Sequence, residues 1–217
     1  MSIITKKVRL IPAPVPFVGT ILTVRVDDGL RFNICTGMLA NKCDHIIVDW
    51  GDGTTQTFND SISNAAHTYP AKGEYHIRIS DDIYYIVIAN ADIESEQTAI
   101  YAPMVIGYSS NATRLTALTP YSFHNCVNLT HLDISQTTVN TISMAALKNC
   151  TALTGHLYFP KVTMLVGINE MQPFCGCTGL AAIHFALDNE AAIEGTTSYS
   201  KDKTLGTGVA DICRFDL

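Results

Sequence analysis

The first third of the chain contains short segments in which apolar and polar residues alternate. Alternation with a period of two is typical of β-strands that bury one face and expose the other. The segments with this pattern are residues 21–26, 30–34, 46–50, 55–58 and 72–79. Asp52-Gly53 lies between the third and the fourth segment, where it favours a tight hairpin because glycine accepts a positive φ angle. The pattern predicts β-structure built from short, half-buried strands.

The second half of the chain repeats one seven-residue pattern at residues 123–129, 147–153 and 174–180. In each copy a large apolar residue stands three before a cysteine, Asn or Gly stands just before it, and Leu stands three after it. The apolar, cysteine and leucine positions are Phe123, Cys126, Leu129, Leu147, Cys150, Leu153, Phe174, Cys177 and Leu180. The cysteines are 24 and 27 residues apart, a period typical of a leucine-rich solenoid with one strand in each repeat.

A strand-like segment follows the cysteine of each repeat. If Leu132, Leu157 and Ile183 face the core, alternate side chains lie on the opposite, open face of the sheet. That face then carries His131, Asp133, His156, Tyr158 and His184. Solenoids commonly contact partners through such a surface, so these five residues are the candidate binding surface. Two other interpretations stay open: a solvated strand face, or a metal ion held by imidazoles on adjacent strands.

Composition and charge narrow the classes of partner. At 47% hydrophobic and 16% charged, the 217 residues can bury a packed core. The formal net charge of −6 argues against nucleic acid as a partner. No apolar run approaches the ~20 residues that cross a bilayer. Three prolines, at positions 12, 14 and 16, interrupt the apolar core that an export signal would need, so no such signal is visible.

The seven cysteines cannot all pair within the chain, because their number is odd. Cys126, Cys150 and Cys177 share one repeat position, and equivalent positions of a solenoid stack at the ~4.8 Å strand spacing. We expect a buried ladder of free thiols, with a disulfide as the alternative. Cys175 and Cys177 are too close in sequence for a zinc site, and no second pair accompanies them. No cofactor is therefore expected.

Three motifs of the first region resemble the PKD family of immunoglobulin-like β-sandwiches. They are Asp-Trp-Gly-Asp-Gly-Thr, His-Thr-Tyr and Gly-x-Tyr-x-Ile-x-Ile, and they lie within roughly residues 20–80 in the order of the family. The resemblance implies a non-catalytic spacer or ligand-holding module. It also implies structural roles for Trp50, Gly51, Asp52, Gly53, Tyr69 and Tyr75.

Some PKD-like domains bind calcium, and Asp49, Asp52 and Asp60 would be the candidate ligands here. However, the chain contains no Asp-x-Asp-x-Asp-Gly loop. Aspartates at turns usually accept hydrogen bonds from backbone amides. We therefore assign no metal to these three residues and expect them to cap turns.

The repeats, with the pattern Phe-x-Asn-Cys-x-x-Leu-Thr-x-Leu-x-Ile, are similar to BspA-type leucine-rich repeats, which are common on bacterial surface proteins. The resemblance covers about residues 108–187, with Leu147 replacing the usual Phe and Gly155 inserted in the second strand. These departures should bend the stack locally. The fold predicted for the whole chain is mainly β with little helix. An immunoglobulin-like (PKD) β-sandwich at 1–82 precedes a short leucine-rich-repeat solenoid at 83–217.

The predicted solenoid begins with an irregular first repeat, in which residues 84–88 and 100–106 resemble strands. It ends with a strand-like segment at residues 212–217. A solenoid has to cover its exposed last layer, and this terminal segment is the natural cap.

The sequence contains no signature of catalysis: no nucleophile elbow, no His-Glu-x-x-His motif and no phosphate-binding loop. Together the two resemblances imply a non-enzymatic adhesion or recognition protein, extracellular or on a bacterial cell surface, that binds a protein or a glycan. One alternative is a tail-associated structural or receptor-binding protein of a phage or prophage particle, which fits unpaired cysteines and the missing signal. Another is an accessory binding module of a larger secreted enzyme. The oligomeric state does not follow from the sequence.

Overall fold

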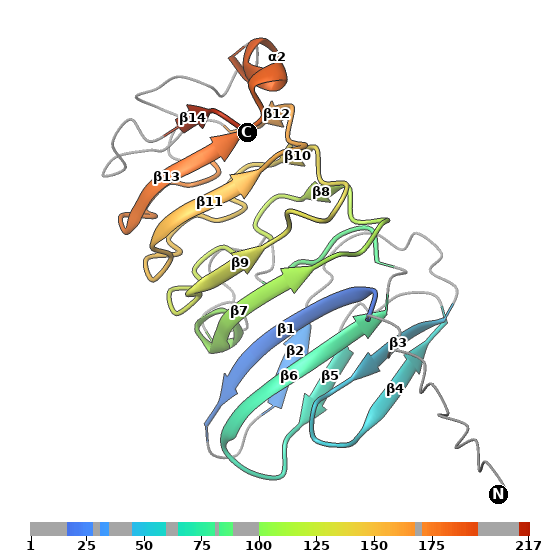
Figure 1. Cartoon of the computed structure of the whole chain (residues 1–217). Coiled ribbons are helices and arrows are strands. Elements are labelled where there is room, and N and C mark those ends of the chain that lie inside the picture. The colour runs from blue at the N-terminus through green and yellow to red at the C-terminus, as the bar shows by residue number, and fades with distance from the viewer. Residues whose placement is uncertain are drawn as a thin grey trace, which may run out of the picture.

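The computed structural model describes residues 17–27, 31–34, 45–59, 65–80, 83–88, 100–167, 171–194 and 213–217. Strands dominate the described residues (Figure 1). Helical segments among them are short, and include η1 (Ala102–Met104), η2 (Leu187–Asn189) and α2 (Glu190–Glu194). The prediction of a mainly β chain with little helix is confirmed. No helix in the described part of the chain is long and apolar enough to cross a membrane.

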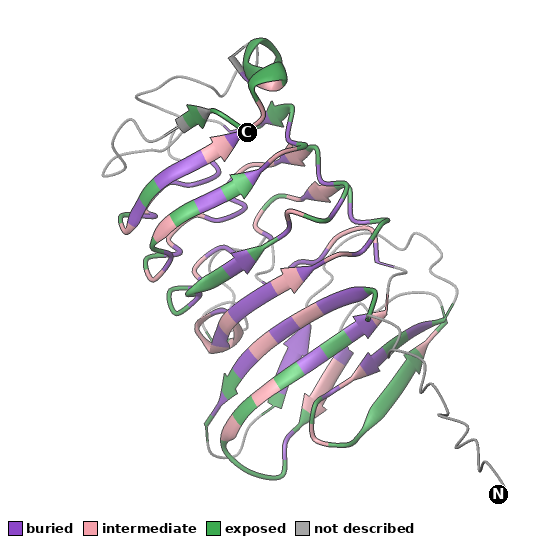
Figure 2. Cartoon of the chain, viewed as in Figure 1, coloured by how far each residue is buried: buried purple, intermediate pink, exposed green. Residues whose placement is uncertain are grey.

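The first region contains an antiparallel sheet and a small second sheet. The large sheet has the order β4 (Thr55–Phe58), β3 (Ile46–Asp49), β6 (Gly73–Ser80) and β1 (Gly19–Val26). β2 (Arg31–Ile34) pairs with β5 (Ala65–Thr68) and lies behind β1 and β6 in Figure 1. Leu22 and Ile77 are fully buried, whereas their neighbours in sequence are exposed or half-buried, and Figure 2 shows this alternation along β6. The large sheet therefore has a core face and an open face.

The second region is a β-solenoid of about three stacked turns. One side carries β7 (Val105–Ser110), β9 (His131–Asp133), β11 (Gly155–Phe159), β13 (Leu180–Phe185) and β14 (Cys213–Phe215). On another side, β8 (Ala117–Leu118), β10 (Thr141–Ile142) and β12 (Met164–Leu165) form a parallel sheet. Stacking strands from successive turns places the core inside the coil, where each turn covers the apolar face of its neighbour.

β1 joins the two regions into one sheet. It pairs antiparallel with β6 on one side and with β7 on the other, so the six-stranded order is β4-β3-β6-β1-β7-β9. Across this sheet Ile21 stands between Arg78 and Ser109, all on the open face. The first region thus covers the edge of the first solenoid strand, which would otherwise be free to pair with another chain. The domain boundary at residue 82 stays a prediction.

The sheet is interrupted between β9 and β11. β11, β13 and β14 form a separate parallel sheet, with a register shift beside Gly155. Gly155 has a φ of 75°, in the left-handed region that favours glycine. The residue that departs from the repeat pattern therefore lies at the irregularity in the stack.

The residue before each repeat cysteine explains why the pattern requires Asn or Gly. Asn125, Asn149 and Gly176 have φ angles of 61°, 63° and 81°. Of the residues with side chains, Asn is among those that best tolerate this region. The turn gives each coil a bond to the next: the N–H of Asn125 donates to Lys148 O at 2.9 Å, and that of Asn149 donates to Cys175 O at 2.7 Å. Asn149 Nδ2 also donates to Asn125 Oδ1 at 2.8 Å.

The three repeat cysteines are buried free thiols. Cys150 Sγ donates to Phe123 O at 3.1 Å, and Cys177 Sγ donates to Leu147 O at 2.9 Å. Burial raises the pKa of the Cys126 thiol well above its usual range, which keeps it neutral. The remaining pattern positions are also buried: Phe123, Leu129, Leu147, Leu153, Phe174 and Leu180.

Two details of the predicted first repeat are wrong, and the predicted cap strand is present. Residues 84–88 form no strand; instead Ile88 N–H donates to Ser122 O at 2.8 Å, against the first turn of the stack. Residues 100–104 are helical, because Pro103 suits the first turn of the short helix η1, and the strand begins at Val105. At the other end β14 pairs in parallel with β13, as expected of a terminal cap.

Candidate functional site

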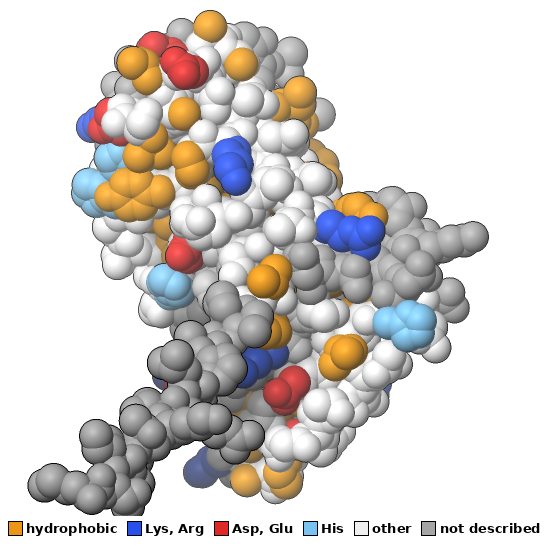
Figure 3. Space-filling view, turned by 45° about the vertical axis from the view of Figure 1, so that its right-hand side comes forward, with side chains coloured by type: hydrophobic (Ala, Val, Ile, Leu, Met, Phe, Trp, Pro, Cys, Tyr) orange, Lys and Arg blue, Asp and Glu red, His pale blue; other side chains and the backbone are white. Residues whose placement is uncertain are grey.

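The five predicted surface residues lie on the open face of the solenoid sheet. His131 and Asp133 come from β9, His156 and Tyr158 from β11, and His184 from β13. The first four are exposed and His184 is half-buried. Figure 3 shows histidine and hydrophobic side chains gathered on this side of the stack. Alternation within short strands therefore predicted the correct face.

Three of the five side chains form a stack of rings. The ring of His184 lies 4.9 Å from that of His156 and 4.7 Å from that of Tyr158, with interplanar angles of 17° and 13°. Strands that pair in register place equivalent side chains one above the other. Tyr158 is opposite His184 in the register of β11 and β13, which explains the stacking.

His184 also links two polar neighbours. Its Nδ1 lies 2.6 Å from Asp216 Oδ1, and its Nε2 lies 2.8 Å from His156 Nδ1. When His184 is neutral and donates through Nδ1–H to the carboxylate, its Nε2 accepts a hydrogen bond from His156. A second proton on His184 would make Nε2 the donor and reverse that bond. The three side chains therefore form one hydrogen-bonded chain at the surface.

Asp216 is a site residue that the sequence did not reveal. It follows β14 and comes close to His184 because β14 pairs with β13, where Arg214 is opposite His184. The backbone N–H of Asp216 donates to Phe185 O at 3.2 Å, which fixes its position. The repeat pattern does not extend to residue 216, so the predicted cap strand was the only sequence feature that pointed to this segment. No sequence pattern gives the register of that strand, which decides that Asp216 lies beside His184.

His131 and Asp133 are not part of the ring stack. Among the described residues, no hydrogen bond or ring contact joins His131 to His156, although the metal interpretation requires imidazoles from adjacent strands to lie together. The interruption between β9 and β11 separates them. Asp133 Oδ1 accepts hydrogen bonds from the N–H and the hydroxyl of Ser135, at 3.0 and 2.8 Å.

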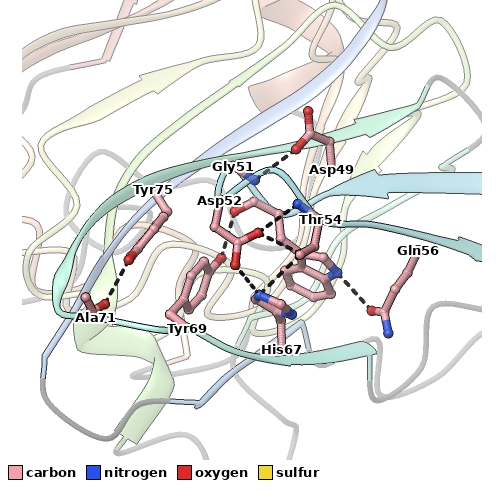
Figure 4. Close-up of polar contacts among 10 residues, drawn as sticks. Asp49, Gly51, Asp52, Thr54, Gln56, His67, Tyr69, Ala71 and Tyr75 are labelled. Atoms are coloured by element: carbon pink, nitrogen blue, oxygen red, sulfur yellow. Dashed lines mark hydrogen bonds and ion pairs between the residues drawn. The ribbon is translucent and has the colours of Figure 1, made fainter.

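The described calcium candidates are engaged by local donors. Asp49 Oδ1 accepts a hydrogen bond from Gly51 N–H at 2.9 Å. Asp52 Oδ1 accepts from the N–H and hydroxyl of Thr54, and Asp52 Oδ2 accepts from His67 Nε2 at 2.7 Å (Figure 4). Asp60 lies outside the described residues. Within the described ranges, no group of three His, Cys, Asp or Glu side chains is placed to hold a metal ion.

Asp52 belongs to a cluster with Trp50, His67 and Tyr69 that stabilises the first region. Its side chain is 6% exposed. Burial would raise the pKa of Asp52, but hydrogen bonds from Thr54 and His67 outweigh burial and lower the pKa to about 2. The His67 ring stacks on the Trp50 ring, with 5.0 Å between the ring centroids. It contacts the Tyr69 ring edge-on, with 4.7 Å between the centroids. The ionised carboxylate is therefore part of the folded structure.

The other contacts of the cluster connect the hairpin to Tyr69 and Tyr75. Trp50 is fully buried, and its Nε1 donates to Gln56 Oε1 at 2.8 Å. The Tyr69 hydroxyl donates to Trp50 O at 3.1 Å, and burial raises the pKa of Tyr69 well above its usual range. Tyr75 stacks on Tyr69 at 4.0 Å. These residues serve stability, and the cluster offers a ligand little surface.

The open face is thus the part of the described chain where exposed rings and charged groups gather. Comparisons of the chain with protein-family models, with curated proteins and with solved structures give no match. The PKD-like and BspA-like assignments therefore stay predictions based on the motifs quoted above.

Proposed function

We propose that this chain is a non-enzymatic recognition protein that binds its ligand on the open face of the solenoid sheet. The observation that supports the proposal is the ring stack of His156, Tyr158 and His184, which Asp216 anchors by a hydrogen bond. Exposed rings held on paired strands lose little freedom on binding, which reduces the entropy cost of association. Tyr in particular combines a large apolar surface with a polar tip.

Adhesion at a bacterial surface is the role that we propose for this recognition. The PKD-like first region would act as a spacer and the BspA-like stack as the contact surface. The continuous pairing β6-β1-β7 supports this division, because it attaches the first strand of the solenoid to the first region within one sheet. The ligand would be a protein or a glycan in an extracellular setting.

A phage or prophage particle is the second candidate setting, and one observation favours it. The described thiols of Cys126, Cys150, Cys175 and Cys177 are all buried and free. Unpaired cysteines are common in proteins that fold in a reducing cytosol, whereas small secreted domains tend to be disulfide-bonded. Immunogold labelling of intact cells and of purified particles would separate the two settings.

The test of the proposed function is binding to a panel of extracellular-matrix proteins and glycans. We expect the double variant His156→Ala/Tyr158→Ala to bind at least tenfold more weakly than the wild type, because central aromatic residues dominate binding energy. Met164→Ala is the matched control, since Met164 is 47% exposed but belongs to β12 in the other sheet. Equal binding by wild type and a folded double variant would refute the assignment of this face.

A further inference from the structure

A hollow of about 250 Å³ opens at the end of the open face, where β1, β7 and β9 meet. Its lining includes two apolar side chains, Phe17 and Ile21, and three polar ones, Ser109, Asp133 and Gln136. Its volume is just below the ~300–1,000 Å³ of pockets for drug-sized ligands. The hollow therefore suits a ligand, or a unit of a ligand, about the size of one ring.

The aromatic wall of the hollow is held in place by Asn111. Gly19 N–H donates to Asn111 Oδ1 at 2.8 Å, Asn111 Nδ2 donates to Phe17 O at 3.0 Å, and Asn111 N–H donates to Gly19 O at 3.0 Å. The guanidinium of Arg78 lies 5.8 Å from the centroid of the Phe17 ring. A Cβ at Gly19 would clash with the backbone oxygen of Ile79 and would lie 2.9 Å from that ring, so this position requires glycine.

The polar part of the lining retains unused hydrogen-bonding capacity. Asp133 Oδ1 is engaged by Ser135, which leaves Oδ2 as an acceptor. Within the described chain, the side chains of Gln136 and Ser109 have no hydrogen-bond partner. Gln136 can donate and accept, and so can Ser109. A ligand would meet three groups able to bond a hydroxyl beside an apolar wall.

Charge restricts the ligand further. Asp133 is the charged residue of the lining, and an anionic group placed there would be repelled. Arg78, on the Phe17 ring, disfavours a cationic group in the same way. A neutral ligand with several hydroxyls and an apolar face satisfies both conditions, and a pyranose ring has these properties.

We infer that this hollow is a subsite for one sugar unit of a neutral glycan. Phe17 and Ile21 contact the C–H face of the sugar, while Asp133 and Gln136 bond its hydroxyls. The inference rests on the proposed recognition function and specifies its ligand class. Further along the same open face lie β11 and β13, with the ring stack that includes Tyr158 (Figure 1). A glycan chain leaving the hollow across the strands would meet these rings.

The experiment is calorimetric titration of the full chain with neutral hexasaccharides of glucose, mannose and N-acetylglucosamine. Asp133→Asn retains the acceptor for Ser135 but loses the charge. We expect this variant to bind about tenfold more weakly to whichever hexasaccharide binds the wild type. Gln136→Ala should weaken it by at least threefold. Asp27→Asn is the matched control, because Asp27 is an exposed carboxylate beyond the far end of β1, and it should stay within twofold.

The possible outcomes separate this inference from the proposed function. Unchanged hexasaccharide binding by folded Asp133→Asn and Gln136→Ala would overturn the subsite, as would preference for sulfated or sialylated glycans. If no neutral hexasaccharide binds but a matrix protein binds through Tyr158, the proposed recognition function is supported and the sugar subsite is wrong. If neither class of ligand binds, both are wrong. Thermal unfolding of each variant verifies that a loss of binding is not a loss of fold.

Discussion

The two regions of the molecule are stabilised in different ways. In the first region, a single cluster around Trp50 joins the hairpin to two other segments through ring contacts and hydrogen bonds. In the solenoid, the same few contacts recur from coil to coil, as with the thiol bonds of Cys150 and Cys177. The first arrangement concentrates stability in a few residues, whereas the second spreads it over equivalent positions.

This difference also separates the residues that stabilise the fold from those that we propose for recognition. The polar groups of the first cluster, such as the Asp52 carboxylate, are already engaged in hydrogen bonds within the protein. On the open face of the solenoid, by contrast, alternate positions of the strands take no part in the core, so Tyr158 and Asp133 are available to a ligand. Substitutions in the cluster should therefore affect folding, and substitutions on the open face should affect binding.

Removing the centre of the cluster should have the largest effect. We expect Trp50→Ala to lower the free energy of unfolding by about 3–5 kcal/mol, because the residue is fully buried and its loss leaves a cavity. Urea unfolding at 25 °C measures the change. Tyr158→Ala, at a position 48% exposed, is the control and should lose less than about 1 kcal/mol. Similar losses in both variants would mean that the buried cluster and the open face contribute equally to stability.

Two glycines of the hairpin give the next largest effect. Gly51 and Gly53 have φ angles of 81° and 90°, so alanine at either position costs about 1–2 kcal/mol in backbone strain. At Gly51 the added Cβ would also lie 2.7 Å from His76 O, whereas nothing lies within 4 Å at Gly53. We expect Gly51→Ala to destabilise the protein by about 2–4 kcal/mol, and Gly53→Ala by the backbone strain alone, about 1–2 kcal/mol. Thermal and urea unfolding would show the order.

The solenoid contains a matching pair of glycines. Gly176 and Gly155 have φ angles of 81° and 75°, and a Cβ at Gly176 would clash with the side chain of Asn149, while Gly155 faces open space. Because the obstacle is a side chain that can move, the difference between the two alanine variants should be smaller than in the hairpin. A larger difference in the solenoid would show that its repeated turns are the more rigid part.

The sequence predicted the strands and the open face because both depend on local alternation. His156 and Tyr158 could be placed on one face without any knowledge of their neighbours, since successive side chains of a strand point to opposite sides. The buried positions of Cys126 and Cys150 followed equally from the repeat. These are properties that a short stretch of chain determines alone.

Contacts that depend on register between distant segments could not be predicted. Asp216 reaches His184 only through the pairing of β14 with β13, 32 residues apart in sequence. The hollow likewise requires Asn111 to hold Phe17, across 94 residues. The pairing of β1 with β7, which joins the regions, leaves no local pattern either. Such features come from which strands meet, and alternation alone does not choose partners.

A single thiol of the ladder should matter less than the hairpin glycine Gly51. We expect Cys150→Ala to lower the free energy of unfolding by about 1–2 kcal/mol, because it removes a buried sulfur and leaves Phe123 O without that donor. Cys175→Ala is the control: Cys175 is 8% exposed and belongs to the same stack, and its loss should be smaller. Urea unfolding of the two variants side by side measures the difference. A larger loss for Cys175→Ala would argue against the thiol bond to Phe123 O.

The smallest expected effect is a loss of stability of the first region at low pH. Hydrogen bonds depress the folded-state pKa of Asp52 to about 2, below the ~3.9 of an unfolded aspartate. A depressed pKa contributes stability that is fully present above pH ~4 and is lost as the pH falls through about 2. After allowance for solvent screening we expect about 1 kcal/mol. Free energies of unfolding of wild type and Asp52→Asn should therefore converge between pH 5 and pH 2.

Thr54→Val provides the matched variant for this measurement. It removes the hydroxyl that donates to Asp52 Oδ1 at 2.6 Å but leaves the carboxylate and its bond to His67. Its acid dependence should lie between those of wild type and Asp52→Asn, because the pKa of Asp52 would then be less depressed. Parallel pH profiles for all three proteins would mean that the ionised carboxylate adds nothing to stability. The cluster would then depend on its ring contacts and neutral hydrogen bonds, as the solenoid depends on its repeated neutral contacts.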